Sequence, residues 1–148
     1  MFKFSVAGNA FKVLAAAARR SRDAVWGAVK LGGMDVVRQA KINVKQTLNT
    51  TGESTGTLGR SITMIPEEAQ LFVRVGPSAI YGAVHEFGAT IKPVKGEFLW
   101  FKGKDGGLVH VRSVRIPKRP YLIPALEAMR AKIRARIEAA TKRLFPGG

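Results

Sequence analysis

Apolar residues recur every three to four positions over the first third of the chain. This spacing predicts an amphipathic helical region over residues 9–49, with Asn9 as a good N-cap. Gly32 and Gly33 interrupt the pattern. Because glycine weakens a helix interior, we expect either two helices or one helix bent at this pair. The apolar stripe comprises Phe11, Leu14, Ala18, Val25 and Val29 before the glycines, and Val37, Ala40, Val44 and Leu48 after them.

The C-terminal segment carries a second, unbroken stripe, which predicts a helix over residues 122–145. Pro124 falls in the first turn of this helix, where its missing N–H would have been unpaired in any case. Pro117 and Pro120 stiffen the approach, so the helix should leave the preceding strand in one fixed direction. The stripe comprises Leu122, Leu126, Met129, Ile133, Ile137, Ala140 and Leu144.

The chain between these two helical regions has a different pattern. Residues 50–60 are polar and rich in glycine, which predicts a loop. Residues 61–116 alternate apolar and polar side chains in short runs, which predicts β structure. A similar alternation at residues 2–6 predicts one short strand before the first helix.

Two hairpins are expected in the β region. In the first, Val73 and Val75 lie on one face of a strand that follows a short polar turn. The second is an extended hairpin over residues 97–116, with Asp105 and the glycine after it in the turn. Its valines change phase near Arg112-Ser113, which predicts a bulge or a strand end there.

These elements predict an α+β fold in a single domain over residues 1–148. We expect an N-terminal helical region, a central antiparallel β-sheet of two hairpins, and a C-terminal amphipathic helix packed on the sheet. A chain of 148 residues that is 46% hydrophobic can bury one modest core but hardly two. The apolar run at the N-terminus is too short for a membrane span.

Charge is concentrated at the two ends of the chain. The net charge of +15 divides into +7 over residues 1–45, zero over residues 46–111 and +8 over residues 112–148. Two basic ends on a neutral body favour an anionic partner, either nucleic acid or an acidic protein surface. The candidates for contact with DNA or such a surface are Arg19, Arg20, Arg22, Lys41, Lys45, Arg130, Lys132, Arg134, Arg136, Lys142 and Arg143.

Residues suited to catalysis are few. The chain has no cysteine, and His85 and His110 lie on separate predicted elements. His85 has no second histidine at the spacing of a zinc-binding helix. The adjacent pair His85-Glu86 has the groups for acid–base chemistry, but a Glu86 paired with a basic residue is the stronger interpretation. We therefore expect a protein that is not an enzyme and that holds no metal or cofactor.

Three short motifs occur in order along the chain: TGTLGRSI at residues 55–62, VGPSAIYGAVHEFGAT at 75–90 and RPYLIPALEAM at 119–129. Together they resemble the motifs of the tail-completion, or head-to-tail joining, proteins in the neck of long-tailed bacteriophages. The matching positions are Thr55, Gly56, Leu58, Ser61, Ile62, Tyr81, Glu86, Phe87, Gly88, Arg119, Pro120, Tyr121, Leu122, Pro124 and Ala125.

The chain departs from the pattern of these proteins in two places. Tyr121 stands where phenylalanine is usual. The connection between Gly88 and Arg119 is longer than is common in the family. The second hairpin is therefore expected to be an addition particular to this protein.

The resemblance implies a structural protein of the virion that forms a ring, expected to be a homo-hexamer, and joins the tail to the head. Its implied partners are copies of itself, the head-completion or stopper proteins on the portal side, and the tail-tube or tail-terminator proteins. Its implied location is the neck of the virion, after assembly in the host cytoplasm, with no membrane contact. Two alternatives stay open: a tail terminator ring that caps the tail tube, and a basic DNA-binding module that acts alone.

The resemblance also suggests roles for individual residues. Glu86 is expected to act as a conformational anchor and to form an ion pair with Arg119. The TGTLGRSI segment is expected to be a contact, or to become ordered on assembly. Basic residues that face a ring lumen are expected to attract passing DNA diffusely, through its phosphates.

Overall fold

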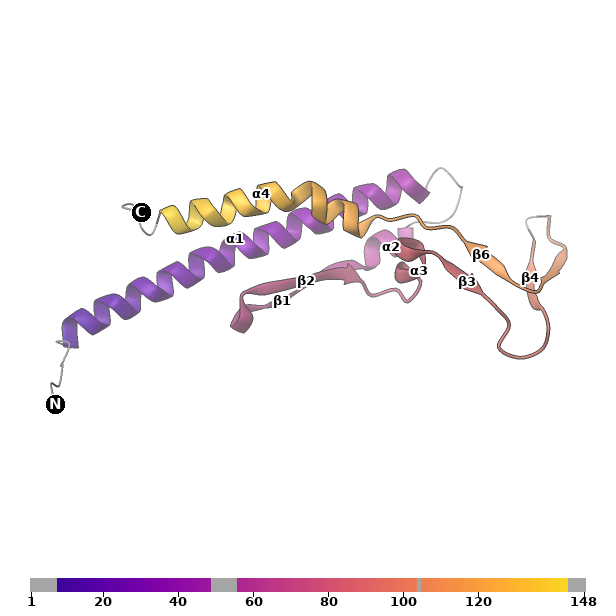
Figure 1. Ribbon diagram of the computed structural model, residues 1–148, viewed down its shortest axis with the longest axis horizontal. Coiled ribbons are helices and arrows are strands. Elements are labelled where there is room, and N and C mark those ends of the chain that lie inside the picture. Colours follow the sequence, from indigo (N-terminus) through magenta and orange to yellow (C-terminus); the bar gives the residue numbers. More distant parts are fainter. Residues whose placement is uncertain (1–7, 49–55, 104, 144–148) are drawn as a thin grey trace.

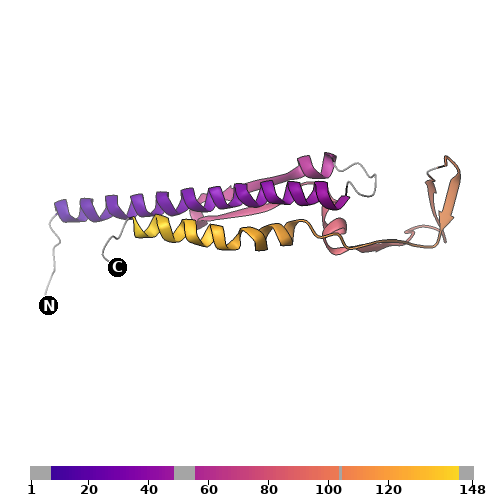
Figure 2. The ribbon, with the colours of Figure 1, turned by 90° about the horizontal axis from the view of Figure 1, so that it is seen from above.

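The computed structural model describes residues 8–48, 56–103 and 105–143 (Figure 1). The fold is α+β, as expected, and the molecule is elongated. Two long helices run side by side, a β-hairpin lies against the longer one, and a narrow β extension projects from one end (Figures 1 and 2). The strand expected at residues 2–6 lies outside the described residues.

The first helix, α1 (Gly8–Leu48), is continuous through Gly32-Gly33, so of the two expected alternatives the division into two helices is wrong. Both glycines are buried because other elements approach the helix closely there. A Cβ on Gly32 would lie 2.9 Å from Ile133 Cγ1, and one on Gly33 would lie 2.5 Å from Met64 Sδ. The glycines therefore serve packing on two sides of α1, and this packing offsets their low helix propensity.

The C-terminal helix, α4 (Leu122–Lys142), runs antiparallel to α1. Its main packing partner is α1 rather than the expected sheet, because the two apolar stripes face each other. The helix ends at Lys142 instead of residue 145. The two stripes also differ from expectation at Leu126 and Ala18, which are exposed.

The first expected hairpin is confirmed. Strands β1 (Ile62–Glu67) and β2 (Phe72–Pro77) pair antiparallel and lie against α1. A short 3₁₀ turn, η2 (Glu68–Gln70), joins them. Val73 and Val75 face inward while the residues on either side of Val73 are exposed, as the alternation predicted.

The loop predicted at residues 50–60 is wrong over its second part, where helix α2 (Gly56–Ser61) forms. Leu58 stabilises this short helix, because its large apolar side chain is almost completely buried in the core. The Ser61 hydroxyl donates to the carbonyl of Leu58 at 2.8 Å and steadies the end of the turn. Residues 49–55, which include the first part of the expected loop, lie outside the described residues.

The second hairpin is shorter than expected, and the strands form three separate pairs instead of one central sheet. Strands β4 (Leu99–Lys102) and β5 (Leu108–Val111) form the hairpin, which we call the arm. Arg112-Ser113 ends β5, as the phase change predicted, and β6 (Val114–Ile116) then pairs with β3 (Ala89–Ile91). The β3–β6 ribbon carries the arm away from the helices (Figures 1 and 2).

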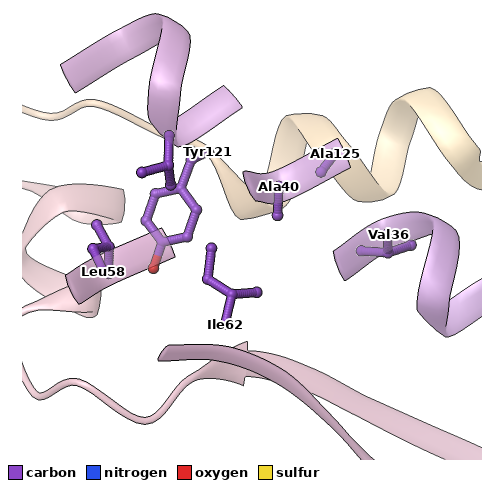
Figure 3. Close-up of a cluster of buried hydrophobic side chains, with 7 residues drawn as sticks. Val36, Ala40, Leu58, Ile62, Tyr121 and Ala125 are labelled. Atoms are coloured by element: carbon purple, nitrogen blue, oxygen red, sulfur yellow. The ribbon is translucent and has the colours of Figure 1, made fainter. Parts of the chain in front are cut away.

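The core lies where α1, α2, β1 and the start of α4 meet (Figure 3). It is small and formed largely by side chains that α1 and the first and third motifs supply. Its buried members are Val36, Ala40, Val44, Leu58, Ile62, Tyr121 and Ala125.

Candidate functional site

The three sequence motifs, far apart along the chain, meet at one place that we call the junction. Leu58 and Ile62 come from the first motif, and Tyr121 and Ala125 from the third, and all four are buried in the core (Figure 3). The second motif forms helix α3 (Gly82–Phe87), which lies beside the start of α4. The most specific part of the sequence therefore builds the point at which the helices and strands are joined.

Glu86 holds the N-terminus of α4. Its side chain is buried, with the residue only 3% exposed. Carboxylate oxygen Oε2 accepts hydrogen bonds from the backbone N–H groups of Tyr121 and Leu122, each at 2.8 Å. Oε1 accepts one from Ile123 N–H at 2.9 Å. A negative charge at this position satisfies three otherwise unpaired donors and complements the positive end of the helix dipole.

Tyr121 fills the centre of the junction. Its ring is almost completely buried, and its hydroxyl donates to the carbonyl of Gly82 at 3.3 Å. The Asn43 side-chain amide donates to the Tyr121 carbonyl at 2.9 Å, which ties α1 to the start of α4. Burial, together with the nearby negative charge of Glu86, raises the pKa of Tyr121 to about 12. The hydroxyl therefore stays protonated and acts as a structural donor.

Two glycines allow the second motif to approach the third. A Cβ on Gly82 would collide with the ring of Pro77 and approach the Tyr121 hydroxyl to 3.0 Å. Gly88 ends α3 with φ 75°, a conformation that side chains disfavour. The Arg119 N–H then donates to the carbonyl of His85 at 2.8 Å. The expected ion pair between Arg119 and Glu86 stays a prediction.

Other motif residues lie at the surface of the junction. Tyr81 and Phe87 are exposed, Phe87 to 65%. Gly56 begins α2 and is exposed. Thr55 lies outside the described residues. The remaining motif positions at the start of α4, Pro120, Leu122 and Pro124, are half-buried.

The basic residues predicted to meet an anion are divided between internal contacts and the surface. Arg22 donates to the carbonyls of Glu68 and Ala69, at 2.8 and 3.3 Å, and so fastens α1 to the turn of the first hairpin. Lys132 and Arg136 contact Asp35. Arg22 and Lys132 stay exposed despite these contacts, as do Arg19, Arg20, Lys45, Arg130, Arg134, Lys142 and Arg143, whereas Lys41 and Arg136 are half-buried.

The antiparallel packing brings basic residues from the start of α1 and the end of α4 to one end of the molecule. The first residues of α1 and the last residues of α4 lie at the same end of the molecule, opposite the arm (Figure 1). Arg19 and Arg20 on α1 and Lys142 and Arg143 on α4 are all exposed. Charges that are separate in the sequence therefore contribute to one strongly basic region of the helical layer.

The sequence interpretation missed Asp35, a buried carboxylate between the long helices. Arg136 Nη1 lies 2.9 Å and Lys132 Nζ 3.2 Å from its Oδ2, and Arg38 contacts Oδ1. Burial by itself would raise the pKa of Asp35, but the hydrogen bonds and charges of Arg136 and Lys132 outweigh it and lower the pKa. The sequence did contain a signal for this site: residues 1–45 hold nine Lys and Arg residues but only two acidic residues, and Asp35 is one of the two.

No three His, Cys, Asp or Glu residues are grouped as metal ligands within the described part of the chain. His85 and His110 lie on α3 and β5 respectively. His85 Nδ1 is buried and has no hydrogen-bond partner among the residues that the structure describes, while His110 stacks against Trp100 at a centroid distance of 4.9 Å. None of the described helices has the length and apolar character needed to cross a membrane.

Comparison with known proteins identifies one family. Residues 13–142 match a family model described as the phage virion morphogenesis family. No curated protein matches the chain, and no solved structure does. The matched region spans nearly the whole chain and includes all three motifs.

Proposed function

The chain belongs to the phage virion morphogenesis family, and on this basis we propose that it is a neck protein that joins the tail to the head. In this proposal it forms a ring, a homo-hexamer, between the head-completion or stopper proteins and the tail tube or its terminator. Its place is the neck of the virion, after assembly in the host cytoplasm. It acts as a structural subunit, without catalysis and without a cofactor.

The observation that carries the proposal is the amount of apolar side chain left exposed on an elongated molecule. Exposed apolar patches of this kind mark surfaces that other proteins cover. They occur on α1, on the first hairpin, around α3, along the arm and on α4. The most exposed are Ile80, Val94, Leu108, Phe87, Trp100 and Ile65.

The basic helical layer supports a position around a DNA channel. Scattered Lys and Arg side chains attract phosphates without reading sequence, which suits a lumen through which DNA must slide. Several of the expected residues are already held by internal partners, Arg22, Lys132 and Arg136 among them. Such diffuse contacts would stabilise passing DNA without stalling it.

The same basic region favours a second candidate, a DNA-binding module that acts alone. The start of α1 and the end of α4, which expose Arg19, Arg20, Lys142 and Arg143, lie at one end of the molecule, and a basic patch is the usual electrostatic footprint of nucleic-acid binding. A tail terminator ring is the nearest alternative within the virion, since it also needs a ring with two faces. The two roles differ in the effect of removing the protein: loss of a terminator should give tails of uncontrolled length, whereas loss of a joining protein should leave tail length normal.

Light scattering on the purified protein, alone and with duplex DNA at low and moderate salt, separates the ring from the stand-alone module. The ring proposal predicts weak DNA binding and an assembly of several chains, each of 16.0 kDa, with a hexamer as the expected form. A monomer that binds duplex tightly, and loses it steeply as salt rises, would favour the DNA-binding module.

A further inference from the structure

We infer that the arm of one copy packs into an apolar groove on the next copy. The groove lies between α4, α1 and β2, and Phe72, Val73, Leu122, Ile123, Leu126 and Ile137 are among its lining residues. This inference rests on the proposed function, in which the chain forms a ring. It identifies the two surfaces through which neighbouring copies in the ring would bind each other. The partner it requires is a second copy of this chain.

The groove is wholly apolar and open to solvent. All of its lining side chains are uncharged, although the chain carries a net charge of +15. Leu126 is 47% exposed, and Phe72 and Ile123 at the rim are also exposed. Leu126 belongs to the apolar stripe of α4 but stays exposed in the groove, so the stripe serves both the packing on α1 and this open surface. An uncharged hollow of this kind calls for an apolar occupant.

The arm has a face of the matching kind. In its strand register, Leu99 is opposite Val111 and Phe101 is opposite Val109. These four residues share one face of the hairpin because side chains alternate along a strand. That face is entirely apolar, and Phe101 on it is 44% exposed. The opposite face carries Trp100, Lys102, Leu108 and His110 and is mixed in character.

The arm needs a partner for its own stability. A two-stranded hairpin is marginal in water unless its apolar face packs against something else. Among the described elements, β4 and β5 pack extensively only against each other. The β3–β6 ribbon holds the arm beyond the end of the helices, away from the groove of the same chain (Figures 1 and 2). On the apolar face Phe101 is exposed while the other three side chains are half-buried, and this face lies beyond the groove of the same chain, where a second copy can reach it.

Charge favours a second copy contacting through these surfaces. Copies that each carry +15 repel one another, and this repulsion is weakest between neutral regions. The arm and the β2 wall of the groove belong to residues 46–111, which have zero net charge, and although α1 and α4 belong to the basic segments, the residues with which they line the groove are uncharged. The basic ends of the long helices lie at the other end of the molecule.

An arm that enters a groove on the next copy makes a heterologous interface. Each copy then has one arm to give and one groove to fill, so the contact repeats from copy to copy. Such a contact closes into a ring when the rotation between neighbours permits, and otherwise grows as a filament. This is the interface that a ring subunit needs.

The test uses carboxylates placed at each surface. Phe101→Glu on the arm and Leu126→Glu in the groove bury a charge in the contact, and each should weaken self-association roughly 30-fold or more. Leu108→Glu changes the opposite face of the arm, where the side chain is 71% exposed, and serves as the arm control. Ala128→Glu, exposed on α4 outside the groove, serves as the helix control. Both controls should associate like the unmodified chain.

A mixing experiment then identifies the pairing. The Phe101→Glu chain keeps its groove and the Leu126→Glu chain keeps its arm, so together they can form one working contact. Analytical ultracentrifugation should find each variant alone as a monomer and the mixture as a 1:1 dimer that grows no further. Circular dichroism and thermal melting of both variants establish that their folds are intact.

Three results would overturn the arm–groove contact. If both variants associate like the unmodified chain, a ring is built through another surface, and the proposed neck function stands. If each variant is monomeric and their mixture does not pair, these surfaces bind something other than each other. An unmodified chain that stays monomeric at high concentration rules out a second copy as the occupant, and the neck role is then tested by its effect on particles.

Discussion

At the scale of single residues, the junction depends on a buried carboxylate used as a helix cap. Glu86 would be costly to bury without partners, yet three backbone N–H groups at the start of α4 satisfy it. Because its partners belong to the backbone, the contact fixes where α4 begins whatever side chains follow. This explains the motif chemistry around residue 120, where the prolines stiffen the chain just before the capped turn.

Replacing Glu86 should therefore destabilise the whole fold. We expect Glu86→Ala to lower the free energy of unfolding by about 2–3 kcal/mol. The buried N–H groups that donate to the carboxylate in the unmodified protein would have no acceptor in the variant. Urea denaturation followed by circular dichroism measures this. Glu127→Ala, on an exposed position of α4, is the matched control and should change stability little. Equal midpoints for the two variants would contradict the capping role.

Asp35 supports a prediction about acid stability. Its folded-state pKa lies below the ordinary value of 3.8, so its ionised form stabilises the fold above that pH. This contribution is lost as the pH falls from about 4 through the lowered pKa. Asp35→Asn removes the charge that Arg38, Lys132 and Arg136 contact. The variant should be less stable near pH 7.

The stability difference between the unmodified chain and Asp35→Asn should shrink as the solution is acidified. Chemical denaturation at several pH values between about 2.5 and 7 measures it. Asp23→Asn, at an exposed position on the same helix, controls for the general effect of removing an acid from a basic protein. A difference that does not vary with pH would argue against a paired, ionised Asp35.

At the scale of elements, glycines in α1 have opposite roles that only packing reveals. Gly27 has no atom within 4 Å of the position a Cβ would take. Gly33 lies where such a Cβ would come within 2.8 Å of Val73 Cγ2 and still closer to Met64. The same residue type therefore costs helix stability at one position and makes room for the first hairpin at the other.

The two alanine variants should change stability in opposite directions. Gly27→Ala should raise the free energy of unfolding by about 1 kcal/mol, since alanine is the better helix former. Gly33→Ala should lower it by about 1–3 kcal/mol, because the added methyl overpacks the contact with β2. Thermal melts of both variants provide the comparison. A stabilising Gly33→Ala would mean that the hairpin does not pack as closely on α1 as described.

Local patterns predicted the kinds of elements but not their long-range contacts. The strand end at Arg112-Ser113 followed from a phase change that neighbouring residues carry, and the structure confirms it. The continuity of α1 through Gly32-Gly33 could not be predicted from neighbouring residues, because the atoms that fill the space beside the glycines come from distant segments. The pairing of β3 with β6 was missed for the same reason.

The motif residues were recognised as a group without their physical roles. Glu86 and Tyr121 are far apart in the sequence, and nothing in their spacing indicates that the Glu86 carboxylate caps the helical turn that begins at Tyr121. Asp35 drew no attention because its three cationic partners include two from the opposite helix. Residue type alone does not report burial, and burial is what makes these groups matter.

At the scale of the whole molecule, the fold separates three kinds of surface along one axis. A basic region lies where the two helix ends meet, an apolar groove follows the middle of the helical layer, and the arm projects from the far end. The small core at the junction holds these surfaces in fixed positions relative to one another. Such an arrangement suits a subunit whose function is to bind neighbours in a defined order.

The most direct test of the neck proposal is electron microscopy of lysates from a phage in which this gene is inactivated. If the protein joins tails to heads, such lysates should contain DNA-filled heads and separate tails of normal length, and purified protein added to the lysate should join them into complete particles. Tails of uncontrolled length would point to a terminator instead. Complete, infectious particles formed without the protein would contradict its role in joining tail to head.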